Sequence, residues 1–308
     1  MSSSRLATNP VPSPLFTGAT REGNLRAMAW MLWASALMVA MNATIKLMTQ
    51  ELPVMVVFFF RMAFAVPLVL PWIVRSGPQI LATERLGQHF VRAVFGALGM
   101  WCWVFGVKYL SLATFTAISF TRPLWMPFTA WLMLGERVNK RRGFLILFGF
   151  AGVLIAARPD MVLDVVVLVA ILGGALSSVT MAQVKQLTAT EPSVRIVFYS
   201  SVFGTLLGLP FAIADWATPS LVQLAWLALS AITAAAGQYC VARAATIGDA
   251  TVITPIDFLQ LPFAALAGFM IFTELPDLLT FAGAAIILLA TLAIAREEQR
   301  RHAQASIQ

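Results

Sequence analysis

Three ionisable side chains stand inside long apolar stretches of the sequence, where a charge is costly. Arg61 lies in FFFRMAFAV, Arg122 in AISFTRPLWM and Asp257 in TPIDFLQLP. On insertion scales each charge costs about 2.5–3.5 kcal/mol at the centre of a membrane helix, so each should face the protein interior and find a partner. A guanidinium pairs with carboxylates and phosphates, whereas a buried carboxylate pairs with an amine or carries a proton. These residue types predict an enclosed polar site for a small charged molecule.

Two of these charges have polar neighbours at helical spacing. Ser119 precedes Arg122 by three residues and Gln260 follows Asp257 by three, so each pair shares one face of a helix. Arg122 either binds the carboxylate or phosphate of a ligand, or pairs permanently with Asp257 or with carbonyls freed by nearby prolines. Asp257 has three open roles, since it can bind an amine, carry a proton or neutralise Arg122.

Other polar and aromatic side chains of the apolar stretches are expected to line the same space. Aromatic walls with few polar groups suit a flat or apolar ligand, although each tryptophan taken singly also fits ordinary helix packing. Lys46 is expected either to join this lining or to extend its ammonium group to the membrane surface, and Glu274 to cap a helix end or pair in a turn. The further candidate site residues are Asn42, Trp101, Trp125, Gln183, Gln238 and Tyr239.

The elements that must position these residues are membrane helices. The chain has 308 residues, of which 59% are hydrophobic and 11% are charged, whereas an ordinary soluble domain has about 25% charged residues. Apolar runs without alternating polarity predict helices rather than a barrel. The sequence therefore predicts an all-α integral membrane protein with ten transmembrane helices, at about 27–48, 53–74, 91–109, 112–134, 142–157, 163–187, 193–214, 221–245, 250–272 and 277–295.

An internal repeat divides these helices into two halves. Each half has five helices, and the odd number means that the second enters the membrane from the opposite side, as in many secondary transporters. The predicted organisation is a disordered tail at 1–26, a first repeat at 27–157, an inverted second repeat at 163–295 and a tail at 296–308. The matches are Lys46–Lys185, Thr49–Thr188, Pro53–Pro192, Phe59–Phe198 and Pro71–Pro210 at an offset of 139, and Gly99–Gly237, Cys102–Cys240, Thr116–Thr254 and Glu136–Glu274 at an offset of 138.

The repeat also brings the candidate site together. At the offset of 138, Ser119 matches Asp257 and Arg122 matches Gln260. An inverted axis would place these pairs at similar depth near the middle of the membrane, with one cationic and one anionic end. Duplication for stability alone, as in an inert bundle, is the alternative interpretation of the repeat.

The net charge of +7 is explained by the orientation of the chain in the membrane and does not indicate binding to nucleic acid. With the N-terminus inside, sixteen basic residues fall in the cytoplasmic loops and tails and three on the outer side. This asymmetry predicts that both termini lie in the cytoplasm and that anionic lipid headgroups are the partners of the basic excess.

The sequence resembles the EamA-type carriers of the drug/metabolite transporter superfamily over residues 27–295. The resemblance rests on FFFRMAFAVPLVL (58–70), on the run from KYLSLATF to GVLIAARP (108–159), and on FMIFTELPDLLTFAGAAIILLATLAIA (269–295). It implies a bacterial inner-membrane carrier of metabolites, whose relatives export amino acids or take up riboflavin and S-adenosylmethionine. The resemblance also implies that the role of Arg61 is mainly structural. The second half departs from the pattern at Leu261 and Thr273, which match Pro123 and Gly135.

No residue pattern in the sequence indicates an enzyme. There is no Walker A pattern, and His89 and His302 are expected outside the membrane, so no triad or metal site is predicted in the spans. Cofactors are not predicted. The sequence favours a secondary carrier for an amino-acid-like or aromatic metabolite, driven by protons through Asp257, by a metabolite gradient or by neither. A non-transporting scaffold or accessory subunit is the rival interpretation.

Overall fold

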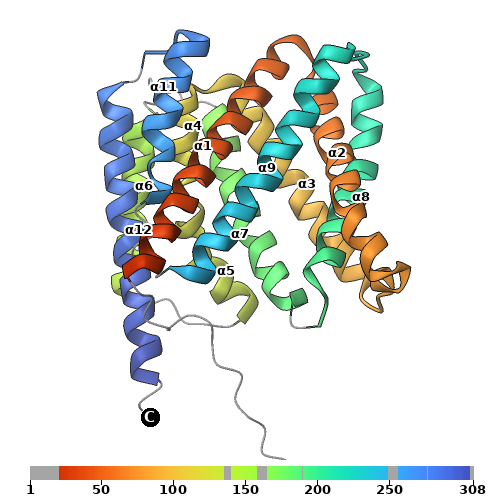
Figure 1. Ribbon diagram of the computed structural model, residues 1–308. Helices are drawn as coiled ribbons and strands as arrows, with labels where there is room; N and C mark the ends of the chain where they lie inside the picture. The colour runs from red at the N-terminus through yellow and green to blue at the C-terminus, as the bar shows by residue number, and fades with distance from the viewer. Residues whose placement is uncertain are drawn as a thin grey trace, which may run out of the picture.

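Every regular element in the described part of the chain is a helix (Figure 1). The computed structural model describes residues 21–134, 140–157, 165–188, 190–248, 256–275 and 277–305. The elements are α1 (Arg21–Glu51), α2 (Val54–Ser76), η1 (Pro78–Leu81), α3 (Leu86–Tyr109), α4 (Leu112–Ser119), α5 (Arg122–Leu134), α6 (Lys140–Ala157), α7 (Val165–Thr188), α8 (Ser193–Ala214), α9 (Leu221–Ile247), α11 (Gln260–Phe272) and α12 (Leu278–Ala305).

Six of the described helices, α1, α2, α3, α7, α8 and α9, are long and apolar enough to cross a membrane. Shorter apolar helices are formed by 143–156 in α6, by α11 and by 278–294 in α12. Large apolar side chains such as Trp33, Val74 and Leu132 are exposed on the outer surface. Such a surface is unfavourable in water but fits acyl chains, so the chain is a multi-pass membrane protein.

The helices extend beyond two predicted boundaries. Residues 21–26 were assigned to a disordered tail but form the start of α1, where Arg26 pairs with Glu22 at 2.6 Å across one helical turn. Residues 1–20 of that tail lie outside the described residues. The last helix was expected to stop at 295 but continues to Ala305, because REEQRRHAQA is rich in helix-forming residues. Of the predicted ninth span, 250–255 also lies outside the described residues.

The two ends of the molecule are named here after a hydrogen bond that lies at each. At the first, called the Glu51 end, Gln223 at the start of α9 donates its Nε2 to Glu51 at the end of α1 (2.7 Å). At the second, called the Glu191 end, Thr83 between α2 and α3 donates its hydroxyl to Glu191 between α7 and α8 (2.8 Å). The start of α1 and the end of α12 both lie toward the Glu191 end, at the bottom of Figure 1.

The directions of the helices follow from these ends. The sequence offset matches α1 with α7, α2 with α8, and α3 with α9. Helices α1, α8 and α3 run toward the Glu51 end, whereas α7, α2 and α9 run toward the Glu191 end. Each helix of these three matched pairs therefore runs opposite to its mate.

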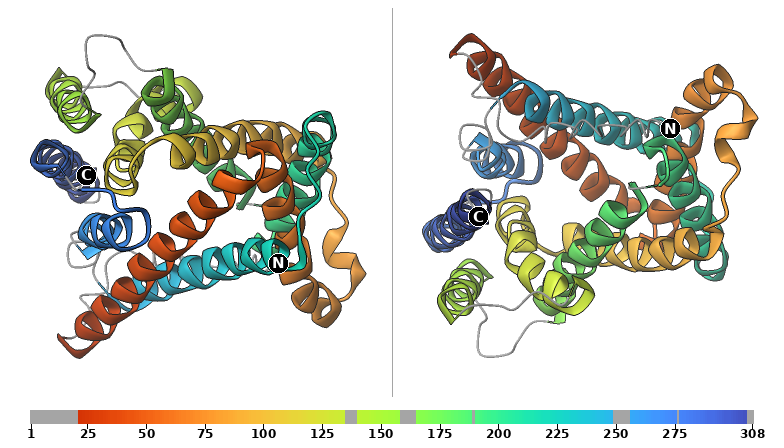
Figure 2. Two further views of the ribbon diagram at one scale, coloured as in Figure 1. Left: turned by 90° about the horizontal axis from the view of Figure 1, so that it is seen from above. Right: turned by 90° about the horizontal axis from the view of Figure 1, so that it is seen from below.

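Much of the packing is preserved when the matched helices are exchanged, although the α1–α3 and α2–α3 contacts have weaker counterparts in α7–α9 and α8–α9. At the offset of 138, α5 also matches α11 and α6 matches α12. Exchange of each helix for its mate turns the α1–α9 contact into the α3–α7 contact and the α1–α11 contact into the α5–α7 contact, and all four are formed. The contacts α2–α8 and α6–α12 map onto themselves. Figure 2 shows the α1–α9 pair and the α3–α7 pair as two long walls, with α2 and α8 closing one edge and α4, α6, α11 and α12 gathered at the other.

Small residues allow the paired helices to approach closely. On α3, Gly99 lies against Leu176 of α7, and a Cβ added at Gly173 of α7 would meet Cys102 at 3.0 Å. The largest apolar cluster joins α1, α3 and α4 through Met41, Val104 and Phe115. The walls are therefore close-packed, which holds the side chains between them in defined positions.

Candidate functional site

Both halves interrupt a helix at the same point of the repeat. In the first half α4 ends at Ser119 and α5 begins at Arg122; in the second a turn at 258–259 precedes α11, which begins at Gln260. The turns carry hydrogen bonds over three residues, from Thr121 N to Ile118 O and from Leu259 N to Ile256 O, each 2.9 Å. Such tight turns end one helix and begin the next.

Prolines account for the interruptions. Pro123 and Pro262 lie in the first turns of α5 and α11. A proline lacks the N–H that would continue the preceding helix but fits the first turn of the following one. The carbonyls left free at such breaks are tolerated in a membrane where they line protein or a wet cavity.

An aromatic pair joins the two interruptions. The rings of Phe120 and Phe258 are stacked, with centroids 4.2 Å apart and planes 20° apart. The two residues are repeat mates at the offset of 138, so each half contributes the equivalent side chain to one contact. The stack therefore lies where the halves meet.

Charges of opposite sign flank this stack. Arg122 is the first residue of α5 and is exposed, whereas Asp257 is half-buried and accepts a hydrogen bond from Nε2 of Gln260. No ion pair joins Arg122 to Asp257 in the part of the chain that the structure describes. The starts of α5 and α11 carry partial positive charge, which favours an anionic group beside them.

The hydroxyl of Ser119 takes no part in this arrangement. It donates to the carbonyl oxygen of Phe115 at 2.9 Å, within α4. The predicted pair of Ser119 and Arg122 is therefore brought to the break, but the donor of Ser119 is used locally.

A second polar group lies between α5 and α7. Trp125 packs edge-on against Phe150 (5.0 Å between centroids), and a Cβ added at Gly174 of α7 would meet Thr121 Oγ1 at 2.9 Å. The hydroxyl of Thr121 and the Nε1 of Trp125 are buried without a hydrogen-bond partner. Gln183, further along α7, has a buried Oε1 without a partner. Buried groups of this kind normally find partners, so they are available to a ligand or water.

A third polar group lies between α1, α2 and α3. Arg61 of α2 holds its guanidinium over the ring of Trp103 of α3, 5.2 Å from its centroid, and its Nη2 contacts the sulfur of Met41 of α1 at 3.4 Å. Its Nε is buried without a partner. The neighbouring Asn42 is buried with an unpaired Oδ1.

An ion pair lies toward the Glu51 end. Lys46 is buried, pairs with Glu274 and donates to the carbonyl oxygen of Leu110 at 2.6 Å. The other carboxylate oxygen of Glu274 accepts from the backbone N–H of Leu112 at 2.9 Å, which caps α4. The expectation that Lys46 extends to the surface is wrong, because a carboxylate and a carbonyl solvate it inside; the expectation for Glu274 is confirmed.

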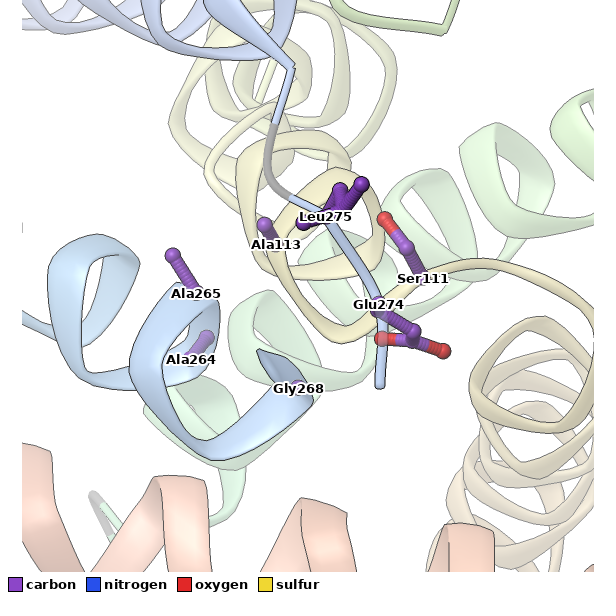
Figure 3. Close-up of a pocket in the computed structure, with 7 residues that line it drawn as sticks. All are labelled: Ser111, Ala113, Ala264, Ala265, Gly268, Glu274 and Leu275. Carbon is purple, nitrogen blue, oxygen red and sulfur yellow. The ribbon is translucent and has the colours of Figure 1, made fainter. Parts of the chain in front are cut away.

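The space beside this ion pair is too small for a metabolite. Figure 3 shows residues that line a small cavity beside the ion pair, among them Ser111, Glu274, Ala264 and Gly268. Its volume is about 10 Å³, enough for no more than one water molecule. The ion pair therefore holds α1, α4 and α11 together, and the cavity beside it is not a binding pocket for a metabolite.

The Glu191 end carries a larger charged group. Arg195 donates Nη1 to Glu191 (2.5 Å) and Nε to the carbonyl oxygen of Ile80 (2.5 Å), while His89 lies 3.7 Å from Glu191. Burial raises the pKa of Glu191, but hydrogen bonds from Arg195 and Thr83 and the nearby positive charges outweigh it, so this pKa is lowered. His89, expected outside the membrane, is buried in the first turn of α3.

The structure does not bring the remaining predicted residues to the helix breaks. Along α3 the ring of Trp101 packs at a tilt against Phe105 (5.6 Å between centroids), and Phe105 packs at a tilt against the exposed Tyr109 (4.8 Å). Gln238 and Tyr239 are exposed on α9, and the ring of Tyr239 meets Trp30 at 6.0 Å.

Sequence reasoning missed several residues of the interior. The stack of Phe120 and Phe258 could have been found, because the offset of 138 that matches Arg122 with Gln260 also matches these phenylalanines. The enclosure of Thr121 gives no sequence signal, since threonine is common in helices of either environment. Arg61 was noticed but was interpreted as structural.

Comparison with known proteins defines the class. The chain belongs to the EamA-like transporter family, whose model matches residues 25–158 and again residues 165–296. It is therefore a two-repeat transporter and not an enzyme. A solved crystal structure superposes with a TM-score of 0.56 over 91% of this chain and 99% of its own, at 19% identity, which shows a shared fold.

Relatives within the family transport different metabolites. A riboflavin transporter of Rhizobium johnstonii is 33% identical over 281 residues, covering 88% of this chain and 91% of the relative. An S-adenosylmethionine uptake transporter of Rickettsia bellii is 30% identical over 251 residues (79% and 84%). A pseudopaline exporter of Pseudomonas aeruginosa is 27% identical over 262 residues (84% and 92%). Together they support transport of a small metabolite without choosing its class.

Proposed function

We propose that the chain is a secondary carrier that moves a small organic metabolite across the bacterial cytoplasmic membrane by alternating access. The observation that carries this proposal is the meeting of two interrupted, repeat-related helices at the Phe120–Phe258 stack, with Arg122 and Asp257 beside it. In secondary transporters the substrate usually binds at interrupted helices with charged groups near the bilayer midplane.

The architecture we propose is ten spans in two inverted halves, 27–157 and 163–295, with both termini in the cytoplasm. The opposite directions of the matched helices support inversion, and the contacts preserved on exchange of the matched helices support two related states. The basic residues gathered toward the Glu191 end, such as Arg75, Arg85 and Arg195, support its cytoplasmic location and its contact with anionic lipid headgroups.

For the substrate we propose an amino-acid-like or heteroaromatic compound that carries a carboxylate or is zwitterionic. Arg122 and the start of α5 would bind its anionic group. Asp257 would bind an amine or carry the coupled proton, with Gln260 orienting its carboxylate. Trp125, with its unpaired Nε1, would contact the ring.

The experiment is transport by purified protein in liposomes against a panel of amino acids, nucleosides and vitamins. We expect the wild type to move at least one member, Arg122→Ala to slow uptake about tenfold or more, and Asp257→Asn to abolish stimulation by a proton gradient if the proton is the coupling ion. Arg26→Gln, which removes an exposed charge at the start of α1, is the matched control and should transport normally.

Each outcome separates one part of the proposal. If the wild type moves nothing on the panel, the carrier proposal fails and a scaffold or accessory role takes its place. Normal transport by Arg122→Ala would show that this arginine is structural while leaving the carrier intact.

A further inference from the structure

The guanidinium of Arg61 has an unusual environment for a charge within a membrane helix. It is the eighth residue of α2, counted from the Glu51 end, which places it about 10 Å along the helix at 1.5 Å per residue. The hydrocarbon core is about 30 Å thick, so the charge lies well below the surface. Its contacts are the Trp103 ring and the Met41 sulfur.

Neither contact balances the charge fully. A thioether is a weak acceptor, and an aromatic face attracts a cation but carries no net negative charge. Within the described ranges no carboxylate forms an ion pair with Arg61. Its Nε–H is buried without an acceptor. Arginine stays charged, so an anion or water must complete its environment.

The repeat shows that the fold does not require this cation. The mate of Arg61 at the offset of 139 is Ser200, which lies in the equivalent part of α8. The mate of Trp103 at the offset of 138 is Val241. The second half thus builds the same helices with a small polar and an aliphatic residue. The arginine and its aromatic platform belong to one half only, as expected for ligand recognition.

We propose that Arg61 and Trp103 form an anion-binding subsite for the carboxylate or phosphate of a planar substrate. The inference rests on the proposed carrier function. Trp103 holds the guanidinium over its ring, and the buried Nε–H together with one Nη–H would bind two oxygens of an anion side by side. Arg122 and Asp257 then remain for the other end of the substrate or for the coupling ion.

The test compares anions with neutral analogues of the same shape. The probes are nicotinate with nicotinamide, indole-3-acetate with indole-3-acetamide, and flavin mononucleotide with riboflavin. Binding to the purified full chain in detergent is titrated by the rise in melting temperature. The first two pairs report a carboxylate and the third a phosphate, so the arms separate the two sources of anion.

We expect the wild type to bind the anion of at least one pair about tenfold or more tightly than its neutral partner, as hydrogen bonds to a charged group provide. Arg61→Gln should reduce this ratio to about one. Arg61→Lys should keep an intermediate ratio, because it retains the charge and loses the two-point grip. Ser200→Ala, the matched control at the mate position, should keep the wild-type ratio.

A structural role would give a different pattern. The melting temperatures of the unliganded variants show whether Arg61→Gln is folded. If it is not, Arg61→Lys and Trp103→Leu carry the test, and Trp103→Leu should weaken both members of a pair. The inference is overturned if the wild type binds no anion of the panel more tightly than its neutral partner, or if Arg61→Gln keeps the ratio. Transport of a neutral compound in liposomes would then leave the carrier proposal standing.

Discussion

Four cations of this chain differ in their partners. Lys46 and Arg195, near the ends of the helices, are neutralised by Glu274 and Glu191. Arg61 and Arg122, within the spans, have no ion-pair partner among the described residues. Paired charges hold elements together, whereas unpaired ones need an anion or water. This difference is our reason for placing the structural role at the ends and recognition inside.

At the residue scale we expect the stability of the Glu191 end to depend on pH. The pKa of Glu191 is lowered in the folded state, so its ionised form stabilises the fold above the ordinary value of 4.5, and this contribution is lost as the pH falls through the lowered value. Glu191→Gln should cost about 2 kcal/mol at pH 7 and progressively less below pH 4.5. Melting temperatures in detergent across pH measure this difference.

Glu84→Gln is the control, because Glu84 is exposed in the same loop region. It should change the melting temperature little at any pH. A loss for Glu191→Gln that is equally large in acid and at neutral pH would contradict the assignment of the effect to ionisation.

Among the elements, close approach depends on where a glycine faces and not only on its presence. The sequence has Gly143, Gly149 and Gly152 along α6. A Cβ added at Gly152 would lie 2.8 Å from the carbonyl oxygen of Gly283 in α12, whereas one at Gly143 meets nothing within 4 Å. The α6–α12 contact therefore uses one part of the helix.

We expect Gly152→Val to destabilise the protein by about 1–3 kcal/mol, because the side chain would force α6 away from α12. Gly143→Val makes the same chemical change on the same helix and should have little effect. Thermal unfolding of both variants in detergent measures the difference. Equal losses would mean that helix propensity, and not the α6–α12 contact, decides the cost.

For the whole molecule, the two halves are related by exchange of matched helices that run in opposite directions. In the alternating-access mechanism that we propose, such a relation provides two similar arrangements that differ in which end is open. The ends themselves are unlike. The mates of His89 and Glu191 are Leu227 and Leu52, so the charged group of the Glu191 end has no equivalent at the Glu51 end, and the two arrangements should differ in stability.

The predicted topology can be tested with single cysteines at the two ends. Thr218 lies between α8 and α9 at the Glu51 end, Glu84 lies between α2 and α3 at the Glu191 end, and both are exposed. In intact cells Thr218→Cys should react with a membrane-impermeant maleimide, whereas Glu84→Cys should react only after permeabilisation. The native Cys102 and Cys240 are buried and provide the background. Reversed labelling would place both termini outside.

The sequence alone was enough for the membrane class, most helix positions, the two-fold repeat and the family, because hydropathy and repetition are properties of residue order. The tertiary structure decided which face of each helix meets which neighbour. Trp101 and Trp103 are two residues apart, or about 200° around a helix. The first packs against Phe105 on the side of the exposed Tyr109, and the second lies under Arg61. Likewise, only the packing of α1 against the α3–α4 and α11–α12 turns encloses Lys46. Those orientations arise from contacts between distant segments, which no local pattern records.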